Sequence, residues 1–242
     1  MLITIMQLIA SGAPANEIAI HVVCCLFAIL ISFSFHEFMH AYVATWLGDP
    51  TPGDMGRVTL NPLAHLDKTG TILLMTIGIG WGKPVVYNPR KLTRLKGKRA
   101  QSRMEIMVAL AGVTGNFAIA FVSTIILAFL VAFGNQEVGV IFMLSKLCVY
   151  LITFSLMLLG FNLIPLPPLD GFRVVEHILP VKWKYMGWYR TFERYAPMAL
   201  MVLMLSSYFT GFSVLSVLVD IMKWPFQTVL DLLLNFLVDL LG

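Results

Sequence analysis

The chain has 242 residues, of which 58% are hydrophobic and 12% are charged, and its mean hydropathy is +0.83. Soluble globular domains carry about 25% charged residues, so this composition excludes a soluble fold and places the chain in a lipid bilayer. The net charge of +4 is explained by Lys and Arg that gather in cytoplasmic loops. The sequence has no basic, aromatic face of the kind that nucleic-acid binding needs.

Four apolar runs are long enough to form membrane-spanning helices. They cover residues 18–47, 106–133, 138–161 and 199–222. The first is predicted to end at Gly48-Asp49-Pro50, because glycine and proline both stop helices. Two of the runs separate the basic clusters 90–103 and 182–194, so both clusters are predicted on the cytoplasmic side of a plasma or inner membrane.

The stretch between the first two runs is predicted to contain a small β element. Thr71 to Ile79 is rich in β-branched residues and has only about half the ~20 residues that a spanning helix needs. Together with Lys83 to Tyr87, it is expected to form a hairpin that dips into the membrane. Arg57 to Leu60 is a further strand-like stretch. The predicted fold is therefore an all-α polytopic bundle with one small β element.

The C-terminal stretch from Pro225 carries Asp231, Asn235 and Asp239 at a spacing of four, which places them on one face of a helix. This pattern suits a helix at the membrane interface or one packed on the bundle. Neither an internal repeat nor a linker is visible. Residues 1–242 are therefore predicted to form one domain with a core over 18–180 and additional C-terminal helices over 199–242.

The first apolar run contains His36-Glu37-Phe38-Met39-His40, which is the H-E-x-x-H pattern of zinc metalloproteases. On a helix the two imidazoles project from one face and can bind one Zn²⁺, while Glu37 accepts a proton from the water that the metal activates. Three ionisable groups in an apolar helix are costly in a bilayer. This cost favours a catalytic metal over the alternatives, a proton relay or a polar packing cluster.

A catalytic zinc site needs a third protein ligand and keeps one position open. The acidic and imidazole side chains that could supply this ligand are Asp49, Asp54, His65, Asp67, Asp170, Glu176 and His177. Asp170 stands out because the prolines of segment 165–169 forbid a regular helix before it. Irregular backbone at membrane depth is tolerated only in a cavity or inside protein. The alternative for Asp170 is an ordinary turn outside the membrane.

Four stretches together resemble the site-2 protease family of intramembrane zinc metalloproteases, in its compact branch without a PDZ domain. They are His36 to His40, Asn61 to Asp67, Gly80 to Val85 and Asn162 to Gly171. The resemblance implies that Asp170 is the third zinc ligand and that Asn162 orients the substrate or stabilises the oxyanion. Asn116 also matches a family asparagine, although the usual proline is missing before it. Its alternative role is an interhelical hydrogen bond.

The predicted reaction is hydrolysis of peptide bonds in or near the transmembrane segments of single-span proteins, with one zinc ion per chain. His65 is expected to cap the site, control metal access or contact substrate, with stabilisation of a turn as the alternative. An exposed strand edge over 71–86 is expected to pair with the unwound substrate. A cation-binding transporter would predict internal repeats, and a catalytically inactive, client-binding relative is disfavoured by the intact Glu37. The sequence does not predict an oligomeric state.

Overall fold

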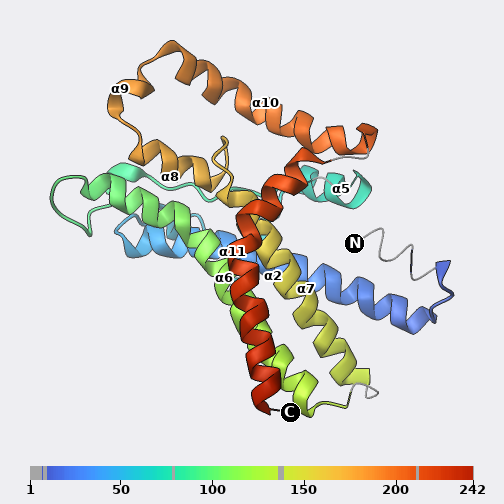
Figure 1. Cartoon of the computed structure of the whole chain (residues 1–242). Helices are drawn as coiled ribbons and strands as arrows, with labels where there is room; N and C mark the ends of the chain where they lie inside the picture. Colours follow the sequence, from blue (N-terminus) through green and yellow to red (C-terminus); the bar gives the residue numbers. More distant parts are fainter. Residues whose placement is uncertain (1–6, 8–9, 78–79, 136–138, 211–212, 242) are drawn as a thin grey trace. The chain divides into compact units, whose positions relative to one another are not determined.

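The protein is a multi-pass helical membrane protein. The computed structural model describes residues 7, 10–77, 80–135, 139–210 and 213–241. Within them, the helices long and apolar enough to cross a membrane are α2 (Ala15–Trp46), α6 (Ala100–Phe133), α7 (Gly139–Leu163) and α11 (Val214–Leu241) (Figure 1). The first three correspond to the first three apolar runs of the sequence.

Shorter helices connect these long ones. They are α3 (Thr51–Asp54), α4 (Pro62–His65), α5 (Lys68–Ile77), the 3₁₀ helix η1 (Pro89–Lys91), α8 (Asp170–Ile178), α9 (Val181–Lys184) and α10 (Gly187–Thr210). The chain divides into two compact units, and all of these shorter helices lie in unit 2. Unit 1 comprises Met1–Phe33, Asn116–Leu156 and Trp224–Gly242, whereas unit 2 comprises Ser34–Gly115 and Met157–Lys223. One protease domain over 1–242 stays a prediction.

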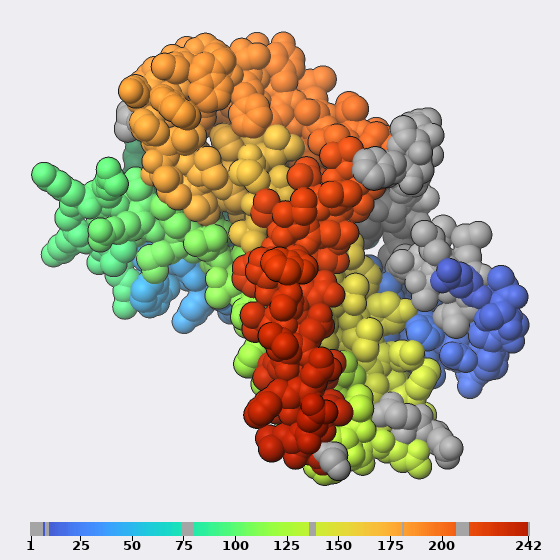
Figure 2. Space-filling model, in the orientation of Figure 1, coloured from blue at the N-terminus to red at the C-terminus, as the bar shows by residue number. Residues whose placement is uncertain are grey.

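Unit 1 is held together by apolar contacts among α6, α7 and α11. Ala120, Leu156 and Leu230 are buried together, and the rings of Phe117 and Phe226 pack edge to face with centroids 5.4 Å apart. Most other side chains of α11 lie at the surface, as the red helix in Figure 2 shows. These apolar side chains are available to the lipid, where helices need no polar cover.

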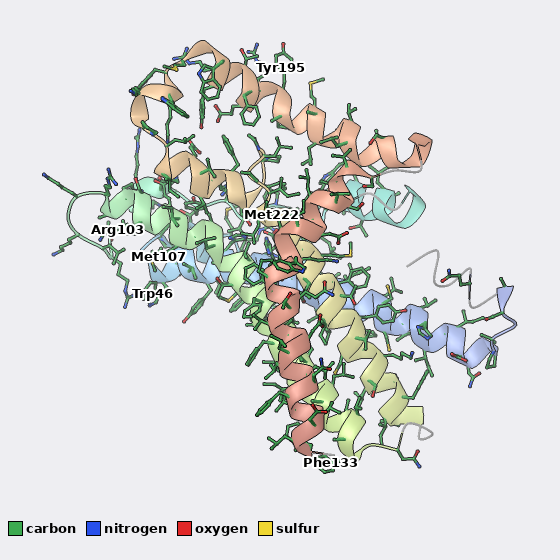
Figure 3. The ribbon with its side chains drawn as sticks, viewed as in Figure 1. Trp46, Arg103, Met107, Phe133, Tyr195 and Met222 are labelled. Carbon is green, nitrogen blue, oxygen red and sulfur yellow. The ribbon has the colours of Figure 1, made fainter. Side chains whose placement is uncertain are left out.

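Unit 2 contains two apolar clusters that position its polar residues. One joins the end of α2 to the start of α6 and the loop before it, through Ala44, Leu47, Leu92, Met104 and Val108. The other joins the connection between α7 and α8 to α10, through Ile164, Leu169 and Leu200. At the edge of the first cluster, the Arg94 guanidinium lies 4.1 Å from the ring centroid of Trp46, which Figure 3 labels.

The end of α2 confirms the predicted stop. Gly48 has φ +115°, a left-handed conformation that glycine adopts without steric cost. A Cβ at this position would lie 2.8 Å from Oγ1 of Thr93, so the close approach of the loop also requires glycine. The carbonyl of Leu47 accepts hydrogen bonds from the N–H groups of Thr93 and Arg94, at 3.0 and 3.1 Å. The helix end is therefore satisfied by the loop that precedes α6.

The predicted β element is wrong. Residues 68–77 form helix α5, positions 78 and 79 lie outside the described residues, and 57–60 is irregular with a bend at 58–59. The physical reason is the cap: Oδ1 of Asp67 accepts from the N–H of Gly70 at 3.0 Å, which satisfies a free donor of the first helical turn. A helix then satisfies its own backbone inside an apolar environment, which an isolated hairpin edge cannot do.

Extended backbone does follow α5, but it belongs to no sheet among the described residues. Leu66 and Gly82 form one isolated antiparallel bridge, and residues 83–88 run on without a partner strand. The composition of 71–79 resembled a strand because β-branched residues suit both a buried helix and a strand. Periodicity over so short a run does not separate the two.

The C-terminal part of the chain also differs from the expectation. The predicted span over 199–222 divides between α10 and α11, and the fourth helix with the length and composition of a span is Val214–Leu241. Pro225 lies inside α11 rather than at its start. Asp231, Asn235 and Asp239 are exposed on this helix. The apolar contacts of Phe226 and Leu230 attach it to α6 and α7.

We predict that the two basic clusters, both in unit 2, face the cytoplasm. Single cysteines at Lys98 and Lys182, both exposed, should react with a membrane-impermeant thiol reagent only from the cytoplasmic face. A cysteine at Asn135, in the turn between α6 and α7, should react only from the opposite face. The native Cys24, Cys25 and Cys148 are buried and serve as the unlabelled background. Labelling of positions 98 and 182 from opposite faces would contradict this topology.

Candidate metal and catalytic centre

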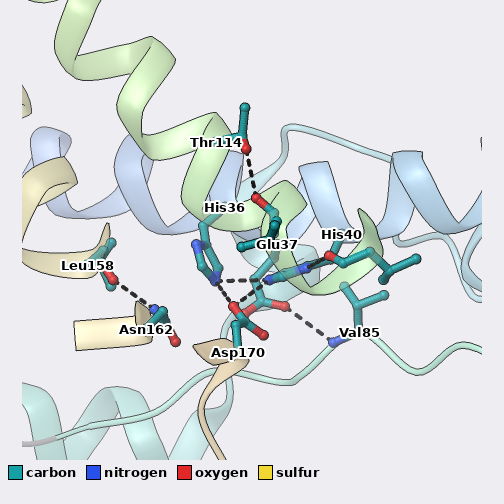
Figure 4. A network of polar contacts seen from close by, with 10 residues as sticks. His36, Glu37, His40, Val85, Thr114, Leu158, Asn162 and Asp170 are labelled. Carbon is teal, nitrogen blue, oxygen red and sulfur yellow. Dashed lines mark hydrogen bonds and ion pairs between the residues drawn. The ribbon is translucent and has the colours of Figure 1, made fainter. Parts of the chain in front are cut away.

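Helix α2 carries the H-E-x-x-H residues in unit 2. His36 and His40 are one helical turn apart and therefore share a face. Their Nε2 atoms lie 3.0 Å apart, and the two imidazoles are buried, with exposures of 4% and 8%. Figure 4 shows both rings directed at the same point. Side chains at this spacing on a rigid helix need little ordering to bind one ion.

Asp170 reaches the same point from the start of α8. Its Oδ2 atom lies 3.3 Å from Nε2 of His36 and 3.1 Å from Nε2 of His40. A Cβ at Gly171 would collide with the carbonyl oxygen of Leu163, so glycine allows α8 to begin against the end of α7. The prolines before Asp170 keep the backbone out of a continuous helix and turn the carboxylate toward α2.

The tautomer of His40 is set by the hydrogen bond of its Nδ1 atom. Nδ1 lies 2.7 Å from the carbonyl oxygen of Val108, and because a carbonyl only accepts, Nδ1 carries the hydrogen. Nε2 then faces His36 and Asp170, where it presents a lone pair in the neutral imidazole and donates to Asp170 in the protonated one. A backbone carbonyl in this position orients a metal-ligating histidine and raises its basicity.

Nε2 of His36, Nε2 of His40 and Oδ2 of Asp170 therefore converge on one point. The ligand atoms of His36, His40 and Asp170 lie within 4.8 Å of one another, and this is the one such cluster of three among the described residues. Two imidazoles and a carboxylate fit a catalytic zinc site, which takes three protein ligands and keeps a fourth position open. The residues present thus fit the metal that the motif implies.

The electrostatics of Asp170 agree with this arrangement. Burial alone would raise the pKa of its carboxyl group, because a desolvated carboxylate is unfavourable. The charge attraction and hydrogen bonds of His40 and His36 outweigh burial and hold that pKa well below its usual range. Asp170 is therefore ionised at neutral pH, as a metal ligand must be.

Glu37 faces a small cavity beside this cluster. Its Oε2 atom accepts a hydrogen bond from the backbone N–H of Val85 at 3.2 Å. The cavity has a volume of about 130 Å³. It is lined by the three candidate ligands and Glu37 together with Pro84, Val85, Tyr87, Val108, Asn162, Pro168 and Arg173. A carboxylate next to the open metal position is placed to exchange protons with whatever occupies it.

The other predicted site residues lie in different settings. Asn162 lines the cavity, and its Nδ2 donates to the carbonyl of Leu158 at 3.0 Å. Asn116 is fully buried in unit 1, so its predicted part in the site stays a prediction. His65 is also fully buried, and its Nε2 lies 2.9 Å from the carbonyl oxygen of Thr59. This contact favours the turn-stabilising alternative for His65.

The remaining ligand candidates are engaged elsewhere. Asp49 accepts hydrogen bonds from Thr51 and Asn88, and Asp67 caps α5. Glu176 pairs with Lys184 at 3.4 Å, and Nε2 of His177 lies 3.1 Å from Oε2 of Glu105. Asp54 is exposed at the end of α3.

Three contributors to the site were not predicted from the sequence. They are the carbonyl of Val108, the N–H of Val85 and Gly112. A Cβ on Gly112 would lie 2.5 Å from Nε2 of His40 and collide with Cε1 of His36. The only sequence signal was a glycine within an apolar helix. Such a glycine indicates close packing but does not show which residues pack against it.

The fold and the site define a membrane-embedded metalloprotease of the H-E-x-x-H class. Comparison with known proteins agrees: the chain is 39% identical over 155 residues to “Putative zinc metalloprotease YwhC” of Bacillus subtilis, across 63% of this chain and 67% of that protein. It is 31% identical over 157 residues to “Putative zinc metalloprotease Rip2” of Mycolicibacterium smegmatis, across 62% of this chain and 56% of that protein. The chain belongs to the site-2 protease family of zinc metalloproteases. No protein-family model and no solved structure matches it.

We predict that Gly112→Ala weakens zinc binding at least about tenfold, because the added methyl group displaces both imidazoles from their common face. Metal analysis and competition with a chelating dye measure the loss. Gly53→Ala is the matched control, because a Cβ at Gly53 meets no atom within 4 Å. Unchanged zinc affinity in Gly112→Ala would show that the histidines do not hold the metal in this arrangement.

Proposed function

We propose that the protein is an intramembrane zinc metalloprotease that hydrolyses peptide bonds in or near the transmembrane segments of single-span membrane proteins. The observation that carries the proposal is the shared cavity of a His-His-Asp cluster and Glu37, built partly on a helix that is long and apolar enough to span a membrane. A buried site of this kind would allow peptide bonds to be hydrolysed within the apolar layer of the membrane. Family membership supports the same chemistry.

His36, His40 and Asp170 would hold one zinc ion per chain. When bound, zinc polarises the scissile carbonyl and lowers the pKa of a coordinated water to near neutral. The hydrogen bond from His40 to Val108 keeps the imidazole turned toward the ion. Asp170 adds a negative charge, which favours a divalent cation in a site with little exposure to water.

Glu37 would accept the proton of the attacking water and return it to the leaving amine. The Val85 N–H holds one oxygen, Oε2, of this carboxylate, whose residue lines the cavity. Asn162 is the candidate for contact with the substrate carbonyl, because an amide nitrogen has two N–H groups and only one is used on Leu158. Asn116 is proposed as a secondary contributor to substrate binding, and His65 as a residue that stabilises the turn at Thr59.

The site would lie toward the cytoplasmic side of a plasma or inner membrane. Both basic clusters belong to the unit that contains the His-His-Asp cluster, and Lys and Arg concentrate on the cytoplasmic side. A transporter would use the same residues for a transported cation. The placement of Glu37 beside the cluster favours a hydrolase instead, because an ion site alone needs no proton acceptor at its open position.

We predict that Glu37→Gln lowers the rate of peptide cleavage by about 10²–10⁴ while about one zinc per chain stays bound. Glutamine keeps the size of the side chain and the acceptor for Val85 but does not take up a proton. The measurement is cleavage of a purified single-span test substrate, with and without a chelator, together with metal analysis. Full activity in this variant would end the proposed mechanism.

We predict that Asp170→Ala loses most of its zinc, because two neutral imidazoles hold the ion much less tightly than two imidazoles and a carboxylate. His65→Ala is the control, since His65 contacts Thr59 rather than the His-His-Asp cluster, and its zinc content should stay near that of the unmodified protein. If metal analysis shows that His65→Ala loses zinc and Asp170→Ala keeps it, the third ligand is His65 and not Asp170.

A further inference from the structure

Segment 83–88 forms one wall of the site without being part of a sheet among the described residues. Pro84, Val85 and Tyr87 line the cavity, and the Val85 N–H donates to Glu37. An extended segment with no partner strand has no ladder to set its register, so other contacts must do so. The position of the Val85 N–H therefore depends on how the two ends of the segment are anchored.

The first end is anchored by backbone, through the N–H of Lys83 and the carbonyl of His65 at 2.7 Å. The second end is anchored by a side chain. The N–H of Asn88 donates to Oδ2 of Asp49 at 2.5 Å. Between these two anchors, the Tyr87 side chain packs against the apolar cluster around Leu47.

Asp49 is suited to this task because both of its oxygens are engaged and its side chain is fully buried. Oδ1 accepts the N–H of Thr51 at 3.0 Å and the Thr51 hydroxyl at 2.6 Å. Burial acts to raise the pKa of the Asp49 carboxyl group, but the hydrogen bonds from Thr51 and Asn88 and the charge of Lys91 lower that pKa below its ordinary value. The carboxylate is thus a fixed, charged acceptor.

Asp49 is also tied closely to the helix that carries Glu37. It follows the last turn of α2, and its own N–H donates to the carbonyl of Ala44 at 3.1 Å. The contact with Asn88 therefore connects segment 83–88 to the same rigid helix that presents Glu37. Val85 lies between the two anchors, and its N–H meets the carboxylate of Glu37.

We propose that Asp49 is a positioning residue for the general base: by holding the Asn88 N–H, it sets the register of segment 83–88 and so brings the Val85 N–H to Glu37. The catalytic part of this inference rests on the proposed function. Asp49 itself contacts no reacting atom. Hydrogen bonds of this kind keep a catalytic carboxylate in its productive orientation, which is a contribution to turnover rather than to substrate binding.

Asp49→Asn separates this role from the hydrogen bonds that Asp49 accepts from Thr51. An asparagine has one acceptor oxygen, which turns to the two donors of Thr51 and leaves an NH₂ group facing the Asn88 N–H. The turn at Thr51 is retained because the side-chain oxygen of asparagine, like that of aspartate, accepts from the backbone N–H two residues on. Thr51→Val is the matched control, since it removes one donor to Oδ1 and keeps the contact with Asn88.

The test is residue-resolved amide hydrogen exchange of the full-length, zinc-loaded protein in detergent, with steady-state cleavage of a single-span test substrate. In Asp49→Asn we expect exchange of the Val85 and Asn88 amides to rise about tenfold, and kcat to fall about tenfold, with KM and zinc content unchanged. Thr51→Val should leave the exchange of both amides, kcat, KM and the zinc content near those of the unmodified protein.

Three outcomes would overturn the inference. They are unchanged exchange at Val85 in Asp49→Asn, equal effects of Asp49→Asn and Thr51→Val, and faster exchange with unchanged kcat. If the unmodified protein does not cleave, the proposed function fails by itself. The exchange at Val85 then still decides whether Asp49 sets the position of the segment.

Discussion

The convergence of three ligand atoms on one buried point is the constraint on which unit 2 depends. Nε2 of His36, Nε2 of His40 and Oδ2 of Asp170 face one another at 3.0 to 3.3 Å, inside protein that excludes most water. Such an arrangement is unfavourable unless a cation or a proton lies among the three atoms. The surrounding structure is built to keep it: Gly112 lets α6 approach the imidazoles, and Gly171 lets α8 begin against α7.

A second constraint is the need of every backbone polar group for a partner at membrane depth. The helices satisfy their own groups, and the irregular backbone of segment 83–88 lines the cavity of the site. The loop that precedes α6 donates to the carbonyl of Leu47, and the segment that follows α5 uses His65, Glu37 and Asp49 as acceptors. The same hydrogen bonds that make this backbone tolerable also position Glu37, the proposed general base. Stability and chemistry are therefore coupled in this part of the molecule.

The division of labour among the elements follows from their rigidity. The helix α2 provides the two histidines and Glu37 at fixed spacing, while Asp170 comes from a helix start that prolines and a glycine direct toward α2. A site assembled from rigid elements can hold its ligands to within a fraction of an ångström, which catalysis at a metal requires. The extended segment 83–88, by contrast, contributes backbone groups, whose pattern does not depend on side-chain identity. For this reason, side-chain patterns in the sequence do not show that the Val85 N–H of this segment meets Glu37.

The sequence by itself determined the membrane class, the first three spanning helices, the stop at Gly48 and the H-E-x-x-H residues, because these depend on composition and on spacing within one helix. It also pointed to Asp170 among seven candidates, since prolines act locally. Helix 68–77 was missed although its cap at Asp67 is a local signal, because β-branched composition favoured a strand. The rest of the site was decided by tertiary structure. It alone placed Val108, Val85 and Gly112 at the site and engaged His65 with Thr59. These contacts join residues 6 to 76 positions apart, and no local pattern encodes which backbone group lies opposite a given side chain.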